Sequence, residues 1–195
     1  MMQKIPKPRI VRGHCEWKTR YFRIVFSEGG TGTPFEMFPK RFQEMFVKQA
    51  LAVEEFFGET FLLQYDLASK VRQITLIVTA VGKEGKARYN MKGIAHVIYP
   101  ERQTYSPLLG KKIGKNTPII LWTPEALKLT NPYEVQHVAR HEIIHAFLNS
   151  FIFSSLGHAN SRHKREFVEN LVDFAALFSA KGTNLIVKRL MKEQT

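Results

Sequence analysis

Apolar residues follow strand-like spacing in the early part of the chain and helix-like spacing in the late part. The early part holds four β-rich runs: Tyr21–Phe26, Gln73–Val81, Gly93–Tyr99 and Thr117–Trp122. Between the first two runs, from Pro39 to Phe57, apolar residues recur at steps of three and four, which predicts a helix with one apolar face. We expect the strands to form a sheet and this helix to cover it.

Helical signals dominate after Asn131. This residue is a favourable N-cap, Pro132 suits the first helical position, and Glu134 follows three residues after the cap. The pattern predicts a helix that ends near Asn149. Two further helices are expected, at about His163–Ala180 and Asn184–Lys192. Strands early and helices late indicate an α+β fold, with a small mixed sheet backed by the N-terminal helix.

Basic residues are concentrated at the N-terminus. The chain has 29 lysines and arginines against 17 acidic residues, a formal charge of +12, and residues 1–25 hold seven of the basic residues and one acidic residue. We expect residues 1–30 to form a basic segment with one strand and residues 31–195 to form a single domain. The segment is either a solvated surface or a non-specific nucleic-acid contact. The candidate contact residues are Lys4, Lys7, Arg9 and Arg12.

Composition excludes several classes of protein. No uninterrupted apolar stretch approaches the roughly 20 residues that cross a bilayer, and no apolar region follows the basic N-terminus as a secretory signal requires. The single cysteine, Cys15, excludes an internal disulfide and a cysteine-rich metal site. These features predict a cytoplasmic protein with no membrane partner.

The helix expected after Asn131 contains the motif His141-Glu-Ile-Ile-His145. Histidines four residues apart lie on one helix face, where two ring nitrogens can reach one ion. Zinc in hydrolases takes three protein ligands and a water, and Glu142 is placed to accept a proton from that water. The alternative is a histidine pair beside an incidental glutamate. That alternative leaves a carboxylate without a counter-charge on a largely apolar helix.

The next predicted helix offers a third ligand in Glu169-Asn-Leu-Val-Asp173. Its large apolar residues share one face, which we expect to fix the direction of the helix: Phe167, Leu171, Phe174 and Phe178. Glu169, Asp173 and Ala176 follow one another along an adjoining face. One carboxylate can bind zinc while the other accepts the N–H of a ligating histidine. The alternative is an exposed acidic stripe.

The sequence HEIIH followed at moderate distance by ENLVD resembles the HExxH and ExxxD motifs of the gluzincins, the thermolysin-type and related zinc peptidases. From Pro118 to Phe178 the chain is also similar to small metallopeptidases encoded by phages and prophages. These proteins continue through HAFL after the second histidine and end in an acidic, VDF-like helix.

The gluzincin resemblance implies a zincin-like fold, in which the HExxH helix and then a Glu-bearing helix follow the sheet. It implies one Zn²⁺ per chain, held by His141, His145 and Glu169, and hydrolysis of a protein or peptide substrate. Glu142 would be the general base, and Asp173 the carboxylate behind a ligating histidine. The resemblance supplies no oxyanion-stabilising residue. Tyr99, Tyr133 and His158 are guesses for that role.

HEIIHAFL also resembles the SprT-like and Spartan proteases, which remove proteins from DNA and take a third histidine from a GHG-x-x-F context. Here Gly157-His158 and His163-Lys-Arg-Glu-Phe167 each supply part of that context. This alternative makes His163 or His158 the third ligand. We favour Glu169, because both histidines lie in or near a polar stretch rich in basic residues, and cations near a metal oppose its binding.

Overall fold

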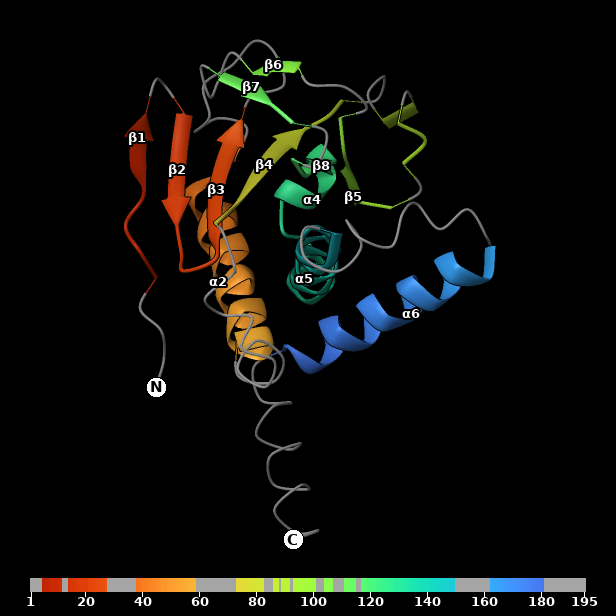
Figure 1. Cartoon of the computed structure of the whole chain (residues 1–195). Helices are drawn as coiled ribbons and strands as arrows, with labels where there is room; N and C mark the ends of the chain where they lie inside the picture. Colours follow the sequence, from red (N-terminus) through yellow and green to blue (C-terminus); the bar gives the residue numbers. More distant parts are fainter. Residues whose placement is uncertain are drawn as a thin grey trace, which may run out of the picture.

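A six-stranded mixed sheet forms the centre of the computed structural model, which describes residues 5–11, 14–27, 38–58, 73–82, 86–87, 89–91, 93–100, 104–106, 111–114, 117–149 and 162–180. The strand order is β1-β2-β3-β4-β8-β5. The strands are β1 (Arg9–Val11), β2 (His14–Lys18), β3 (Phe22–Ser27), β4 (Ile74–Ala80), β5 (Ala95–Ile98) and β8 (Ile119–Trp122). Figure 1 shows α2 and α5 on one side of this sheet.

Strand direction changes at both sides of the sheet. β3, β4 and β8 are parallel, whereas β1, β2 and β5 each run antiparallel to a neighbour. Parallel neighbours cannot be joined by a tight hairpin, and the helix α2 (Lys40–Phe57) lies between β3 and β4 in the chain. β8 is followed by the short α4 (Pro124–Leu127) and by α5 (Pro132–Leu148). In the strand order, β1 and β5 are the two edges of the sheet.

Aromatic side chains join the helices to the sheet. Phe42 of α2 meets Trp122 edge to face, with ring centroids 5.1 Å apart. Phe147 of α5 stacks on Phe57 of α2 at 4.6 Å and meets Phe22 of β3 at 6.2 Å. These contacts hold both helices against the same face of the sheet.

A short hairpin contributes to the opposite face. It consists of β6 (Thr104–Ser106) and β7 (Lys111–Ile113), which pair antiparallel. A small apolar cluster forms there, with the members Val25, Ile77, Ile113 and Ile119. None of the four β-rich runs expected from the sequence includes this hairpin.

The N-terminal segment holds three strands among its described residues, not the single strand that the sequence predicted. β2 is a central strand, and its residue Glu16 is buried. Arg23 Nη2 lies 2.5 Å and Lys18 Nζ 3.3 Å from the Glu16 carboxylate. Charge within β2 obscured its strand pattern in the sequence, whereas in the structure the Glu16 carboxylate is paired with both cations.

The proposed nucleic-acid residues lie partly outside the described part of the chain. Lys7 and Arg9 are exposed at the β1 edge, whereas Lys4 and Arg12 are not described. Five inter-strand steps of about 4.8 Å separate this edge from β5, or roughly 24 Å. No helix among the described residues combines the length and apolar character needed to span a membrane.

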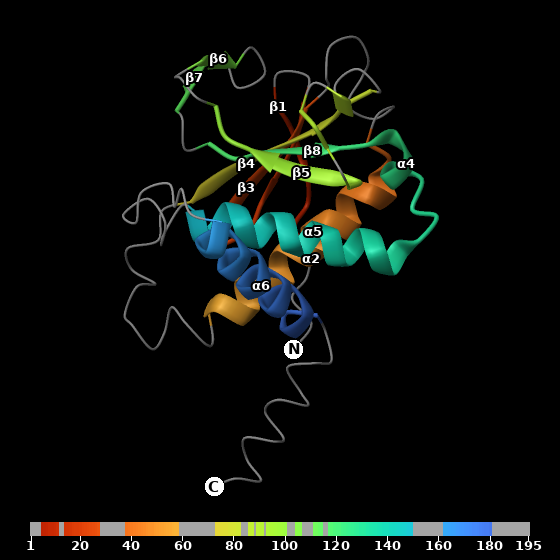
Figure 2. The ribbon, with the colours of Figure 1, turned by 90° about the vertical axis from the view of Figure 1, so that its right-hand side faces the viewer.

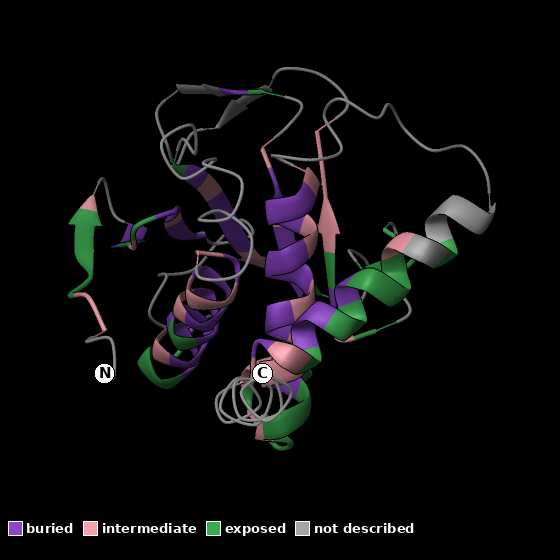
Figure 3. Cartoon of the chain, turned by 60° about the horizontal axis from the view of Figure 1, so that its bottom comes forward, coloured by how far each residue is buried: buried purple, intermediate pink, exposed green. Residues whose placement is uncertain are grey.

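The buried face of the helix α6 (Arg162–Phe178) is not the one that the sequence predicted. Leu171 and Phe174 are 40% and 55% exposed, so the predicted apolar face points outward at these positions. The buried residues are instead Val172, Ala175 and Ala176. Small side chains allow α6 to approach α5 closely. Figure 3 shows the contrast between the buried α5 and the largely exposed α6. The helix expected at 184–192 lies outside the described residues.

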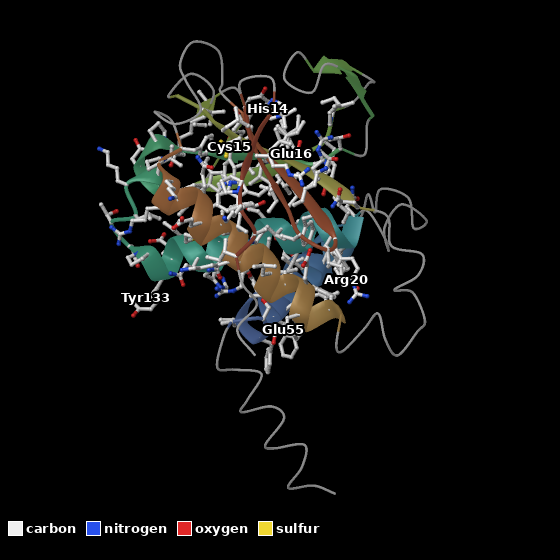
Figure 4. The ribbon with its side chains drawn as sticks, turned by 90° about the vertical axis from the view of Figure 1, so that its left-hand side faces the viewer. His14, Cys15, Glu16, Arg20, Glu55 and Tyr133 are labelled. Carbon is white, nitrogen blue, oxygen red and sulfur yellow. The ribbon has the colours of Figure 1, made fainter. Side chains whose placement is uncertain are left out.

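Replacing Phe147 by alanine should lower the free energy of unfolding by about 3–5 kcal/mol, because it leaves a cavity where α5, α2 and β3 meet. Chemical denaturation measures this change. Tyr133→Ala in the same helix is the control: Tyr133 is 82% exposed and projects away from the molecule (Figure 4). Its effect should stay within about 0.5 kcal/mol. Equal losses in the two variants would contradict the packing described for α5.

Candidate metal centre

The helix α5 brings the two histidines of the motif together. Its start matches the sequence signal, since the Asn131 side chain accepts a hydrogen bond from the Glu134 backbone N–H at 3.3 Å. One helical turn separates His141 from His145, and their Nε2 atoms are 3.0 Å apart. Both imidazoles thus direct one nitrogen toward a common point.

The helix α6 adds a carboxylate to this pair. Glu169 Oε2 lies 3.2 Å from His145 Nε2 and 3.5 Å from His141 Nε2. One ligand atom from each of the three residues falls within 4.8 Å of the others, so the cluster can hold a metal ion. Figure 2 shows α6 crossing α5, the arrangement that allows this contact.

Asp173 lies behind His141, one turn after Glu169 on the same face of α6. Its Oδ1 is 2.7 Å from His141 Nδ1, so Nδ1–H donates to the carboxylate and Nε2 faces the cluster, with a lone pair there when the imidazole is neutral. A carboxylate in this position fixes the tautomer and orientation of a metal-binding imidazole. The contact therefore prepares His141 to act as a ligand.

The histidines and carboxylates stabilise one another's charged forms. Hydrogen bonds from His141 and His145 hold the pKa of Glu169 well below its ordinary value. Burial by itself lowers the pKa of His141, but the hydrogen bond to Glu169 and the charges of Glu142 and Asp173 outweigh it and raise that pKa above its ordinary value. A divalent cation would take the place of this proton between the carboxylate and the imidazoles.

The Glu142 carboxylate lies close to β5, an edge strand of the sheet. Thr123 N–H donates to Ile94 O at 2.9 Å where β8 pairs with β5. Hydrogen-bonded and non-hydrogen-bonded pairs alternate along antiparallel strands. Ile94 belongs to a hydrogen-bonded pair, so Val97, three residues later, belongs to a non-hydrogen-bonded pair and its N–H is directed away from β8. The Glu142 carboxylate lies close enough to this N–H for the N–H to lower the pKa of the carboxylate.

The Glu142 side chain is buried, and burial raises its pKa above the ordinary value. The nearby charges of His145, His141 and His96 and the Val97 N–H act in the opposite direction without cancelling the effect of burial. A carboxylate with a raised pKa accepts a proton more readily, which is what a general base requires.

The structure brings together four of the residues selected from the sequence and places Glu142 beside them. The four are His141, His145, Glu169 and Asp173. The rival ligand His158 and the side chain of His163 lie outside the described residues. Among the described candidate ligands, Glu169 therefore completes the set.

Two guesses for the oxyanion-stabilising residue lie in unsuitable places. Tyr133 is eight residues before His141 on α5, about 12 Å along the helix axis, and it is exposed. The Tyr99 hydroxyl donates to the His145 backbone carbonyl at 3.3 Å, and burial raises its pKa. Tyr99 thus anchors β5 to α5.

Two histidines near the cluster received no role from the sequence. His137 Nε2 lies 4.0 Å from Asp173 Oδ1, and a signal for it existed, since residue 137 is one turn before His141 on the same helix face. His96 on β5 is close enough to Glu142 to affect its pKa. No motif places a strand residue beside the helix, so His96 could not be found from the sequence.

No protein-family model, curated protein or solved structure matches this chain. What is established about the site comes from its own geometry. Two imidazoles and one carboxylate converge, a second carboxylate orients one imidazole, and the three converging groups can hold a metal ion. Nitrogen and oxygen donors of this kind suit zinc and other first-row divalent metals.

In the metal-free protein, the NMR titration midpoint of His141 should lie above 6.5, since the carboxylates of α6 favour the imidazolium. Asp173→Asn removes a negative charge and should move the midpoint to lower pH. The His141→Gln variant assigns the resonance. A midpoint that is the same with Asp173 and with asparagine would show that the contact has no electrostatic effect.

Zinc titration of four variants should separate the candidate third ligands. Glu169→Ala removes a donor atom and should weaken zinc binding by about 100-fold or more, and Asp173→Ala should weaken it by roughly 10- to 100-fold. His163→Ala and His158→Ala should leave the affinity nearly unchanged. Loss of zinc in either histidine variant, with zinc retained in Glu169→Ala, would transfer the ligand role to that histidine.

Proposed function

We propose that this protein is a zinc-dependent peptidase of the gluzincin type, in which His141, His145 and Glu169 hold the metal and Glu142 is the general base. The observation that supports it most is the convergence of the three donor groups beside a buried carboxylate with a raised pKa. The proposal includes a zincin-like fold. The parallel strands β4 and β8, the antiparallel edge strand β5 and the helix α5 beneath them suit that class.

Each residue of the site has a task in this proposal. Bound zinc would supply a Lewis acid and lower the pKa of its water. Glu142 would accept the proton of the attacking water and pass it to the leaving amine of the peptide. Glu169 reduces the positive charge of the site, and Asp173 keeps the His141 Nε2 lone pair directed at the metal.

Two histidines and one carboxylate are also a ligand set for non-haem iron. Glu142 favours hydrolysis, because a buried carboxylate next to the ligands suits proton transfer from water. The metal content of the purified protein separates the two possibilities. Iron in place of zinc, with no hydrolysis, would contradict the proposal.

The alternative remains a SprT-like protease that acts on DNA-associated proteins, with His163 or His158 as third ligand. The contact of Glu169 with both motif histidines favours the gluzincin set instead. The exposed Lys7 and Arg9 lie at the sheet edge opposite β5, so any nucleic acid bound there contacts a different part of the molecule from the metal centre.

Glu142→Gln should retain zinc but lose hydrolysis of a general peptide substrate such as casein. The amide keeps the shape and can still accept the Val97 N–H, but it cannot take a proton from water. General bases contribute about 10²- to 10⁴-fold, so the rate should fall by at least about 100-fold. Rates are measured with zinc at saturation and with chelator.

Glu55→Gln is the matched control, because it makes the same substitution at a partly exposed position near the end of α2. It should leave both zinc binding and hydrolysis unchanged. Hydrolysis at the normal rate in Glu142→Gln would remove Glu142 from the mechanism.

A further inference from the structure

Arg140 connects three helices immediately next to the metal centre. It precedes His141 on α5, but its side chain is buried. Its Nε donates to the Ala176 backbone carbonyl of α6 at 2.8 Å, and its Nη1 donates to Gln49 Oε1 of α2 at 2.6 Å. A guanidinium is always protonated in proteins, so both bonds are charge-assisted.

The Ala176 carbonyl belongs to the last turn of α6, where helix carbonyls lack their usual backbone partners. The Ala180 N–H, which would continue the helical pattern to Ala176, donates to Leu177 O at 3.2 Å instead. The Ser179 hydroxyl donates to Ala176 O at 3.3 Å. A cation at a helix C-terminus also interacts favourably with the helix dipole. Arg140 thus caps α6 from a neighbouring helix.

Three contacts form a row along the crossing of α5 and α6. Arg140 meets Ala176, His141 meets Asp173 and His145 meets Glu169, in opposite order along the two helices. The Asp173 and Glu169 side chains are 55% and 56% exposed, whereas Arg140 is buried. Exposed ion pairs stabilise a fixed geometry only slightly. The buried contact between Arg140 and Ala176 therefore resists movement of α6 along α5 more than the two exposed contacts do.

We propose that Arg140 is a positioning residue that sets the register of α6 on α5 and thereby delivers Glu169 and Asp173 to the histidines. A shift of one residue along α6 moves a side chain by about 1.5 Å and rotates it by about 100°. Such a shift would turn Glu169 away from the site. The inference rests on the proposed function, because the role of Arg140 is defined by the metal affinity that it supports.

The first test is titration of the folded, full-length protein with Zn²⁺ and, for its absorption spectrum, Co²⁺. Arg140→Met should bind zinc at least about tenfold more weakly, as changes behind metal ligands do. Arg140→Lys keeps the charge but loses the planar guanidinium that reaches two helices at once. Its zinc affinity should lie between those of Arg140→Met and the wild type.

The matched control is Gln43→Met. Gln43 is also buried and joins separate elements, since it accepts from Trp17 Nε1 at 3.0 Å and donates to Phe38 O at 2.8 Å. The Gln43→Met substitution should lower the thermal stability of the protein without changing its zinc affinity. Equal losses of zinc affinity in Gln43→Met and Arg140→Met would show a general effect of stability and overturn the proposal.

The second test is a double-mutant cycle between Arg140→Met on α5 and Glu169→Ala on the neighbouring helix α6. If Arg140 acts by placing Glu169 and Asp173, its substitution should cost clearly less zinc affinity once Glu169 is absent, because only the part that acts through Asp173 remains. Fully additive losses would mean that Arg140 does not place Glu169, which contradicts the inference. If Arg140→Met does not fold, Arg140→Lys takes its place in the cycle.

The outcomes distinguish this inference from the proposed function. Wild-type protein that neither binds zinc nor hydrolyses peptides would refute the proposed function. If the wild-type protein does both, and Arg140→Lys and Arg140→Met bind zinc as tightly as the wild type, only the role of Arg140 is refuted.

Discussion

Two imidazole nitrogens 3.0 Å apart on one helix impose the main electrostatic constraint on this molecule. Two lone pairs this close repel, so the arrangement requires a proton or a cation between them. The rest of the site responds to that requirement: Glu169 approaches both nitrogens, and Asp173 accepts the opposite N–H of His141. The sheet and α2 hold α5 in place, and α6 supplies the compensating negative charge.

Much of the fold follows from periodicity. The patterns predicted the strands β3, β4, β5 and β8 and the helices α2, α5 and α6 to within about two residues at each end. β1 and β2 were missed because the basic residues around them made residues 1–25 look like a charged leader. The contact between Glu16 of β2 and Arg23 of β3 forms only after the strands pair. The hairpin β6–β7 was missed because strands of three residues show no period.

The candidate site was predictable where spacing on a helix determines it. The four-residue step joins His141 to His145, and the same step aligns Glu169 with Asp173. The expected reason for the direction of α6 was wrong, since its small residues pack against α5 while Leu171 and Phe174 point outward. The contacts made by backbone groups, such as the Val97 N–H, have no signature in side-chain patterns, because every residue except proline carries the same donor.

The position of Glu142 also affects the outer edge of the sheet. An edge strand offers unpaired backbone groups to any other extended chain, and proteins commonly protect such edges with charge. Here the Glu142 carboxylate lies close to the Val97 N–H of β5. A foreign strand that adds to the sheet at this point must first displace that carboxylate. Under the proposed function, one side chain therefore serves both proton transfer at the site and the resistance of the protein to strand-by-strand self-assembly.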